Sequence, residues 1–219
     1  MKTIVNFSLL LPMLCISMHL QAQRISLKVA MNMTDMYFYN EAEGLGRNFN
    51  TLKSMQAGIM YEKILTNYLS LESSLMVTGK GAMIVESDLS SNRRIENSLR
   101  FTYVEVPVCL KVYHDFNGAK LFAQAGLSGS VALMGSSEIS TKTPEGIKTS
   151  KSSIQWGIKE RTHPFRRLDY GLLVGAGVEF GRVQLGLSCQ WGEANIYLTE
   201  GREVYHAVLA FSTAFRLTD

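Results

Sequence analysis

Long stretches in which apolar and polar side chains alternate constrain this chain more than any other feature. In residues 168–180 the even positions are all apolar, whereas the odd positions hold Asp169, Leu173, Glu179 and three glycines. Successive side chains of a β-strand point to opposite faces, so a period of two predicts strands with one apolar face and one polar face. The alternation predicts eight long strands, over 24–37, 52–64, 68–80, 98–114, 119–134, 168–180, 182–196 and 203–217.

The connections between these runs alternate in length. Three of them are tight turns, at 65–67, 115–118 and 181. Four are longer and polar, at 38–51, 81–97, 135–167 and 197–202. Eight long antiparallel strands with short periplasmic turns and longer extracellular loops are typical of outer-membrane barrels. We therefore predict an all-β fold, an eight-stranded antiparallel up-and-down transmembrane β-barrel with both termini on the periplasmic side.

The choice between a membrane barrel and a soluble barrel depends on which face is outside. Most runs reach the ~9–11 residues that cross a bilayer at a tilt. Aromatic residues also lie near both ends of the apolar faces, as in interfacial girdles: Tyr37, Tyr170, Trp191 and Tyr205 towards the loops, and Tyr61, Phe180 and Phe215 towards the turns. Both features favour an apolar face towards lipid. The alternative is a soluble periplasmic or secreted β-barrel that binds an apolar ligand inside.

The first 22 residues have the pattern of a secretory signal peptide. Lys2 precedes a short apolar run over 7–18, and the segment then ends on the small residue Ala22. The run is too short to span a bilayer as a helix. We predict cleavage after Ala22, which leaves residues 23–219 as a barrel domain in the outer membrane of a Gram-negative envelope.

The polar faces carry ionisable residues that would point into the barrel. We predict a structural charge network in the lumen, formed by Glu62, Glu72, Glu105, Lys111, Lys120, Asp169, Glu179 and Arg216. An eight-stranded barrel is just wide enough for side chains to fill. Unpaired charges inside it would be costly, so these groups should be paired or wetted. We expect Glu72 and Lys111 to interact, and we expect no continuous diffusion pore.

The turn positions also give approximate pairings between strands. A second turn centred between Phe116 and Asn117 would place Lys111 opposite Phe122, and Glu105 opposite Ser128. A third turn near Gly181 would place Glu179 near Gln184. In each pair both residues lie on the polar face, as cross-strand partners must.

The sequence offers little chemistry beyond this network. A net charge of +3 is too weak to indicate a nucleic-acid partner, and three cysteines do not make a disulfide scaffold. Metal-ligand spacings such as CxxC and HExxH are missing from the sequence. We therefore predict no catalytic residue, no cofactor and no metal site. Cys109 and Cys189 fall on opposite faces of non-adjacent strands, so we expect no disulfide between them.

One enzymatic alternative stays open. His206 and Asp169 both lie at strand positions that the alternation points into the barrel, near its outer rim. Some barrel enzymes use histidine with serine or aspartate there. A barrel-embedded lipid- or peptide-modifying enzyme acting through His206 is therefore the second alternative, although the sequence has no specific Ser-His-acid spacing.

The longest connection, 135–167, has a pattern of its own. Residues 136–143 and 147–154 flank Pro144-Glu145-Gly146, a turn signal. Such a hairpin would be polar on both faces, so we expect it to project outside the barrel rather than to add two strands to it. The basic segment 159–167 could contact anionic lipopolysaccharide. The expected partners are outer-membrane lipid and lipopolysaccharide, the outer-membrane assembly machinery, and envelope proteins that bind loops 81–97 and 135–167.

Several short motifs resemble one family. Tyr103-Val104-Glu105-Val106-Pro107, then Leu110-Lys111, and later Leu168-Asp169-Tyr170-Gly171 with Gly175-Ala176-Gly177-Val178-Glu179, are similar to the PorT-like outer-membrane β-barrel family. The resemblance covers most of residues 23–219. It implies a porin-like eight-stranded barrel in the outer membrane and no enzymatic activity, with a structural, interaction or secretion-associated role. It also suggests a tolerated β-bulge at Pro107, because proline cannot donate to a ladder.

Overall fold

The computed structural model describes residues 23–40, 44–46, 50–88, 93–143, 146–154, 156, 165–197 and 203–218. The expected signal peptide, residues 1–22, and most of the basic segment 159–167 lie outside these residues. No helix in the described ranges is long and apolar enough to cross a membrane.

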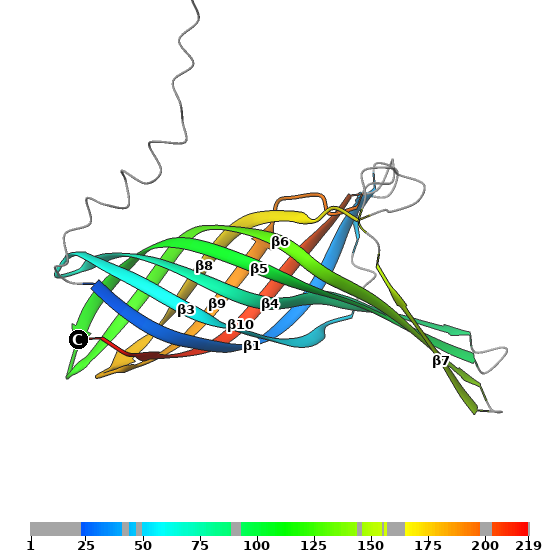
Figure 1. The fold of residues 1–219 in the computed structure, drawn as a ribbon, viewed down its shortest axis with the longest axis horizontal. Coiled ribbons are helices and arrows are strands. Elements are labelled where there is room, and N and C mark those ends of the chain that lie inside the picture. Colours follow the sequence, from blue (N-terminus) through cyan, green and yellow to red (C-terminus); the bar gives the residue numbers. More distant parts are fainter. Residues whose placement is uncertain are drawn as a thin grey trace, which may run out of the picture.

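The described chain is built almost entirely of long antiparallel strands (Figure 1). They are β1 (Gln23–Asn40), β2 (Gly44–Gly46), β3 (Leu52–Thr66), β4 (Leu69–Asp88), β5 (Arg93–Phe116), β6 (Ala119–Thr143), β7 (Gly146–Ser153), β8 (Leu168–Phe180), β9 (Val183–Gly192) and β10 (Glu203–Arg216). Eight of them overlap the eight runs that alternation predicts, and β4, β5 and β6 extend well beyond those runs at one end. The short β2 is an addition, and β7 is the second strand of the expected hairpin.

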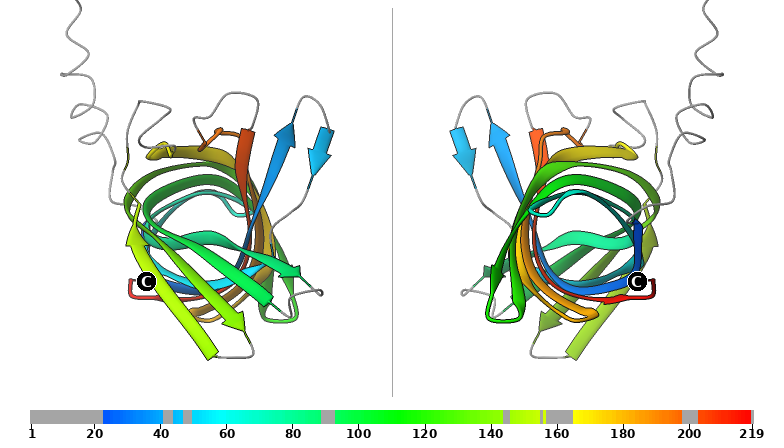
Figure 2. Two further views of the ribbon diagram at one scale, coloured as in Figure 1. Left: turned by 90° about the vertical axis from the view of Figure 1, so that its right-hand side faces the viewer. Right: turned by 90° about the vertical axis from the view of Figure 1, so that its left-hand side faces the viewer.

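The eight long strands form a closed ring (Figure 2). Each pairs with its neighbour in the order β1, β3, β4, β5, β6, β8, β9, β10, and β10 pairs again with β1, from Ser26 opposite Arg216 to Tyr39 opposite Glu203. Strands β2 and β7 pair only with β1 and β6, respectively, outside this ring. The predicted eight-stranded antiparallel barrel is confirmed.

The two ends of the barrel differ. At the turn end, two-residue turns join β3 to β4, β5 to β6 and β8 to β9, and residues 23 and 218 also lie there. Asn117 and Gly118 both have positive φ, 47° and 84°, as the central residues of a type I′ hairpin turn require. The opposite end, the loop end, carries the longer connections.

The type I′ turn corrects two predicted pairings. Because Asn117 and Gly118 take its central positions, Lys111 pairs with Gln124 and Glu105 with Ser130. The predicted partners, Phe122 and Ser128, are therefore wrong by two residues, although they face the right way. Glu179 pairs with Gln184, as predicted.

The expected bulge at Pro107 is also wrong. The register between β5 and each neighbouring strand is the same on both sides of Pro107. The β4–β5 ladder lacks pairs only between Ser73–Val108 and Met76–Glu105. Since proline has no N–H to donate, a local gap in the ladder suffices and the chain keeps its register.

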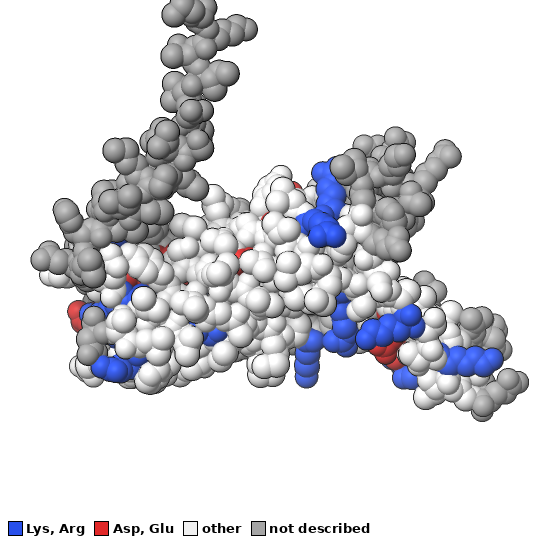
Figure 3. All heavy atoms as spheres, viewed as in Figure 1, with Lys and Arg blue, Asp and Glu red and all other residues white. Residues whose placement is uncertain are grey.

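The barrel is polar inside and apolar outside. Leu127 on the outward face of β6 is 64% exposed, whereas Lys111 on the inward face of β5 is fully buried. Most of the face shown in Figure 3 is correspondingly uncharged over the middle of the barrel, and Lys and Arg gather towards its ends. A soluble barrel with an apolar ligand inside would need the reverse arrangement. The outward aromatic residues include Tyr170 and Trp191 at the loop end and Phe180 and Phe215 at the turn end.

Three strands continue well beyond the loop-end rim (Figure 1). We call this part the projecting sheet: residues 81–88 of β4, 93–101 of β5, 135–143 of β6, and β7. The expected loop 81–97 is thus mostly paired strand, from Gly81–Arg100 to Asp88–Arg93. The expected hairpin forms between β6 and β7, from Ser136–Ser153 to Thr143–Gly146, and lies outside the ring. Every described residue of β7 is exposed.

Candidate functional site

The lumen holds the molecule's main concentration of buried charge. These charges form two groups at different positions along the barrel axis, one nearer the turn end and one nearer the loop end. The turn-end network comprises Arg24, Lys28, Glu62, Glu72, Lys111, Glu179 and Arg216. The loop-end network comprises Lys80, Glu105 and Asp169, with Ser130 and Gln190. These side chains come from all eight strands of the ring and point inward from each, so the closed ring is what creates both networks.

Lys111 is at the centre of the turn-end network. Its Nζ lies 3.0 Å from Glu72 Oε2 and 3.5 Å from Glu62 Oε1, and it donates to Gln184 Oε1 at 2.7 Å. The other Glu72 oxygen accepts from Lys28 Nζ at 3.1 Å. The structure thus brings Glu72 and Lys111 together, as the strand parity suggests.

The same network spans the closure between the first and last strands. Glu179 on β8 accepts from Arg24 on β1 at 3.2 Å and from Arg216 on β10. Arg24 also lies 3.9 Å from Glu62, which accepts from Tyr113. The ion pairs of the turn-end network therefore link six strands in addition to their backbone ladders.

In the loop-end network one lysine holds two carboxylates. Lys80 Nζ is 2.8 Å from Glu105 Oε2 and 2.9 Å from Asp169 Oδ2, and its side chain is fully buried. With its amide oriented to satisfy both ends, Gln190 donates to Glu105 at 3.1 Å and accepts from Lys80 at 3.1 Å. Lys80 also lies 5.2 Å from the centre of the Tyr103 ring.

The two networks together balance their formal charge. Among the described residues they hold five cations and five carboxylates. Removing one partner of a buried pair leaves an uncompensated charge and is strongly destabilising, by ~3–5 kcal/mol. The arrangement therefore ties the strand register to the charge pattern, because a one-residue slip would turn these groups towards lipid.

Seven of the eight predicted network residues lie in these clusters. The exception is Lys120, which is half-buried near the turn end with its Nζ 5.9 Å from the centre of the Tyr113 ring. The prediction missed Arg24, Lys28 and Lys80. The alternation could have identified them, because all three lie at inward-facing strand positions, as do the acidic residues that they contact.

An aromatic cap closes the lumen above the loop-end network. Phe101, at its centre, packs within 5.3–5.8 Å, between ring centres, of Trp156, Phe165 and His206. His206 is buried, and its Nε2 lies 3.2 Å from the Tyr103 hydroxyl. Met36, Ala82, Ala132, Ile196 and Val204 complete this buried cluster. No local sequence pattern predicts the cap, because its members come from five strands and two loops.

His206 and Asp169, the two residues on which the enzymatic alternative depends, make no hydrogen bond with each other. Both residues point inward and are buried, as parity predicts. However, His206 Nδ1 and Asp169 Oδ1 have no hydrogen-bond partner within the described chain, and Asp169 Oδ2 is taken by Lys80. The arrangement therefore lacks a carboxylate-oriented histidine base of the kind that serine hydrolases use.

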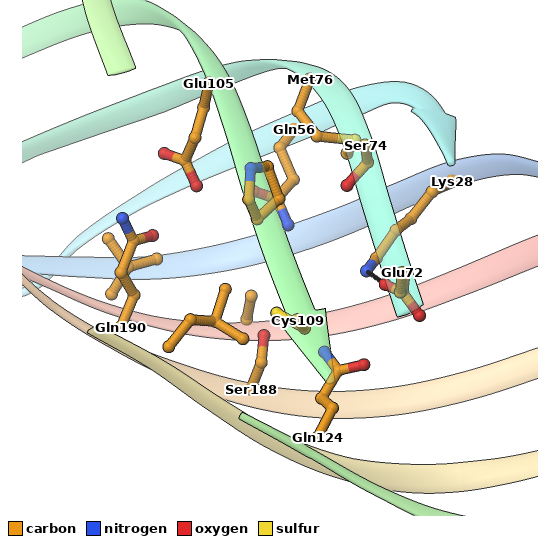
Figure 4. A pocket seen from close by; sticks show the side chains of 14 residues that line it. Lys28, Gln56, Glu72, Ser74, Met76, Glu105, Cys109, Gln124, Ser188 and Gln190 are labelled. Atoms are coloured by element: carbon orange, nitrogen blue, oxygen red, sulfur yellow. Dashed lines mark hydrogen bonds and ion pairs between the residues drawn. The ribbon is translucent and has the colours of Figure 1, made fainter. Parts of the chain in front are cut away.

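A small cavity separates the two networks (Figure 4). Lys28 and Glu72 line it on one side, and Glu105 and Gln190 on the other. It leaves about 20 Å³ for the centres of water molecules, which is room for about one. Ser74 Oγ and Gln124 Oε1, both buried and lining this cavity, have no hydrogen-bond partner among the described residues. This cavity has no room for a solute larger than water.

The cysteines and possible metal ligands add no further site. Cys109 is buried in the lumen, Cys189 is half-buried on the outer face, and both are free thiols. In the part of the chain that the structure describes, no group of three or more His, Cys, Asp or Glu could hold a metal ion.

A closed antiparallel barrel with a charged interior and an apolar exterior defines the class of transmembrane β-barrels. The family model described as outer membrane protein beta-barrel domain matches residues 21–196. The chain belongs to this family, and its location is the outer membrane.

Solved structures with a similar fold include several outer-membrane proteins. The attachment invasion locus protein Ail of Yersinia pestis is 10% identical, with a TM-score of 0.41, over 90% of this chain and 100% of that chain. OprG from Pseudomonas aeruginosa is 8% identical, with a TM-score of 0.46, over 90% and 97%. The protease OmpT from Escherichia coli is 12% identical, with a TM-score of 0.39, over 89% and 96%. No curated protein matches the sequence.

Proposed function

We propose that this protein is a non-enzymatic integral outer-membrane barrel whose lumen is a structural plug and whose projecting sheet meets partners in the envelope. The observation that carries this proposal is the filled lumen. Two buried ion-pair networks and an aromatic cap occupy successive levels of the barrel, and the cavity between the networks has room for about one water. A barrel of this kind offers neither a pore nor an accessible internal active site.

The proposal includes an orientation and a maturation step. Short turns face the periplasm in outer-membrane barrels and longer segments face outward, so the termini would be periplasmic and the projecting sheet external. Residues 1–22 would direct export and be removed, and the outer-membrane assembly machinery would insert the barrel. The motifs around Glu105 and Asp169 support a place among PorT-like barrels, with a structural, interaction or secretion-associated role.

Conductance across a planar lipid bilayer tests the plug. We expect the refolded protein to migrate differently on a gel before and after boiling, which demonstrates a folded barrel, and to show no stable conductance steps. The variant F101A/W156A, which removes two rings of the cap but leaves both ion networks in place, should also stay closed. Stable conductance by the folded wild-type protein would overturn the proposal.

The same preparation tests the non-enzymatic assignment. We expect no hydrolysis of phospholipid, lipopolysaccharide or peptide substrates by wild-type protein. An activity that the His206→Ala variant loses, while still showing the gel shift of a folded barrel, would contradict the assignment.

A further inference from the structure

The projecting sheet and the adjoining residues 165–167 carry an unusual concentration of positive charge. Over the described side chains of 81–85, 94–101, 135–143, 146–154 and 165–167, seven residues are basic: Arg94, Arg100, Lys142, Lys148, Lys151, Arg166 and Arg167. Two are acidic, Glu96 and Glu138. The difference over these side chains is +5; with Glu86, Asp88 and Arg93, which the sequence also places in the projecting sheet, it is +4, against +3 for the whole chain. Figure 3 shows blue atoms over the projecting sheet, with a smaller group of red atoms among them.

Most of this charge is not neutralised within the described structure. Glu96 is shared between Arg94 Nε at 2.9 Å and Lys142 Nζ at 3.1 Å. Arg100, Lys148 and Lys151 are exposed and make no ion pair with any residue that the structure describes. Glu138 is the cross-strand neighbour of Lys151, but the exposed cations of this surface outnumber its carboxylates, which suits it to an anionic ligand.

The cations begin where the apolar outer face ends. Arg167 directly precedes Leu168 and Tyr170, which are 59% and 53% exposed on the lipid-facing side of β8. Arg167 lies beside β6, because its carbonyl accepts from Ala132 N at 2.8 Å. Arg100 pairs with Ser136, four residues further along β6. This places the first cations just beyond the loop-end aromatic girdle, at the depth where lipid headgroups start.

We propose that the projecting sheet binds the phosphate groups of lipopolysaccharide in the outer leaflet around the barrel. The inference rests on the proposed outward orientation of the loop end. Arg and Lys are the side chains that bind phosphate, and each cation near an anionic membrane surface contributes about 1 kcal/mol. A peptide strand added to the β7 edge fits less well, because edge lysines such as Lys148 and Lys151 discourage strand addition.

The direct test is titration of the folded protein, in nanodiscs of neutral phosphatidylcholine, with purified lipopolysaccharide. The variant R100Q/K151Q removes two unpaired cations that share the outer face of the projecting sheet. We expect it to bind at least about tenfold more weakly than wild type, at about 1 kcal/mol per cation. The control K63Q/R182Q removes the same charge at the turn end and should bind like wild type. Raising the salt from 0.05 to 0.3 M should weaken wild-type binding, because exposed charges are screened.

Three results would overturn the proposal. One is equal binding by R100Q/K151Q and wild type. Another is undiminished binding of lipopolysaccharide from which the phosphates have been removed. The third is tight binding of soluble inorganic polyphosphate with none of lipopolysaccharide, which would assign the surface to a soluble polyanion.

Orientation is tested separately, so the two proposals can fail independently. A Ser150→Cys variant places a thiol on exposed β7. We expect a membrane-impermeant maleimide to label it on intact cells above the wild-type background of Cys109 and Cys189. Labelling only after permeabilisation would refute the orientation, while the nanodisc titration would still report whether the sheet binds lipopolysaccharide phosphate.

Discussion

The two halves of strand β5 follow different rules. In the barrel half, buried Glu105, Cys109 and Lys111 alternate with outward valines and Leu110. In the projecting half, residues 94–100 are exposed or half-buried on both faces, and arginine, asparagine and serine stand among the apolar residues. The backbone ladder to β6 nevertheless runs through both halves, with one register shift at Thr102/Tyr103.

This difference reflects the two solvents that the strand meets. Inside the membrane one face must be apolar for lipid and the other must fill a narrow lumen, so alternation is compulsory. Beyond the membrane both faces meet water, and backbone hydrogen bonds alone keep the strands paired. Removing a charged side chain should therefore lower the free energy of unfolding strongly in the barrel half and only slightly in the projecting half.

The largest expected contrast is between a buried and an exposed lysine. Replacing Lys111 by Met leaves Glu62 and Glu72 short of a partner inside the lumen, so we expect a loss of about 3–5 kcal/mol in the free energy of unfolding. The side chain of Lys142 is 45% exposed in its pair with Glu96. Replacing Lys142 by Met should therefore lower the free energy of unfolding by at most about 1 kcal/mol. Urea unfolding in lipid vesicles measures both. Similar losses would mean that the lumen is as well hydrated as the surface.

A second contrast concerns the outward faces of the two halves. Leu127→Arg puts a charge on the lipid-facing side of β6 and should cost about 2–4 kcal/mol if it lies near the bilayer midplane. Ile147→Arg, on the exposed edge strand β7, should change stability by no more than about 0.5 kcal/mol. The same unfolding experiment compares them. A tolerated Leu127→Arg would argue that this face is not in lipid.

A third contrast sharpens the difference between the inside and the outside of the barrel wall. A Cβ at Gly177 would lie 2.1 Å from the Leu185 carbonyl oxygen and 2.5 Å from Phe122 Cζ, whereas one at Gly129 meets nothing within 4 Å. Gly177→Ala should therefore destabilise by about 1–3 kcal/mol through overpacking, and Gly129→Ala should be nearly neutral. Gel-shift melting temperatures would detect this, and a neutral Gly177→Ala would show that the lumen can readily rearrange.

The smallest effect is expected in the projecting sheet itself. A hydrogen bond from Lys142, together with the charges of Lys142 and Arg94, lowers the pKa of Glu96. The stabilisation is therefore complete above the ordinary pKa of glutamate and is lost as the pH falls through the lowered pKa. Hydrogen exchange of the β5–β6 amides should speed up in that acidic range, beyond the intrinsic pH effect, in wild type but not in Glu96→Gln. Identical pH profiles would show that the pair contributes nothing.

Most of the barrel could be predicted from particular residues. Alternation in 168–180 and 203–217 places β8 and β10 with the correct faces, and inward parity identifies seven members of the charge networks. The register of β5 against β6 required the turn type at Asn117–Gly118, because a shift of two residues leaves every face unchanged. The projecting sheet is harder to predict from the sequence. A strand that is exposed to water on both faces does not need to alternate apolar and polar residues, so it lacks the period of two.

The sequence by itself determined the strands, their inward and outward faces and hence the membrane as the surrounding solvent, because each is encoded within a single run of residues. Only the tertiary structure decided which charges meet. Lys80 forms an ion pair with Asp169 on β8, and Arg24 forms one with Glu179 across the closure of the ring. These partners are separated by 89 and 155 positions in the chain. Their contact depends on the register and closure of all eight strands, and no local pattern carries that information.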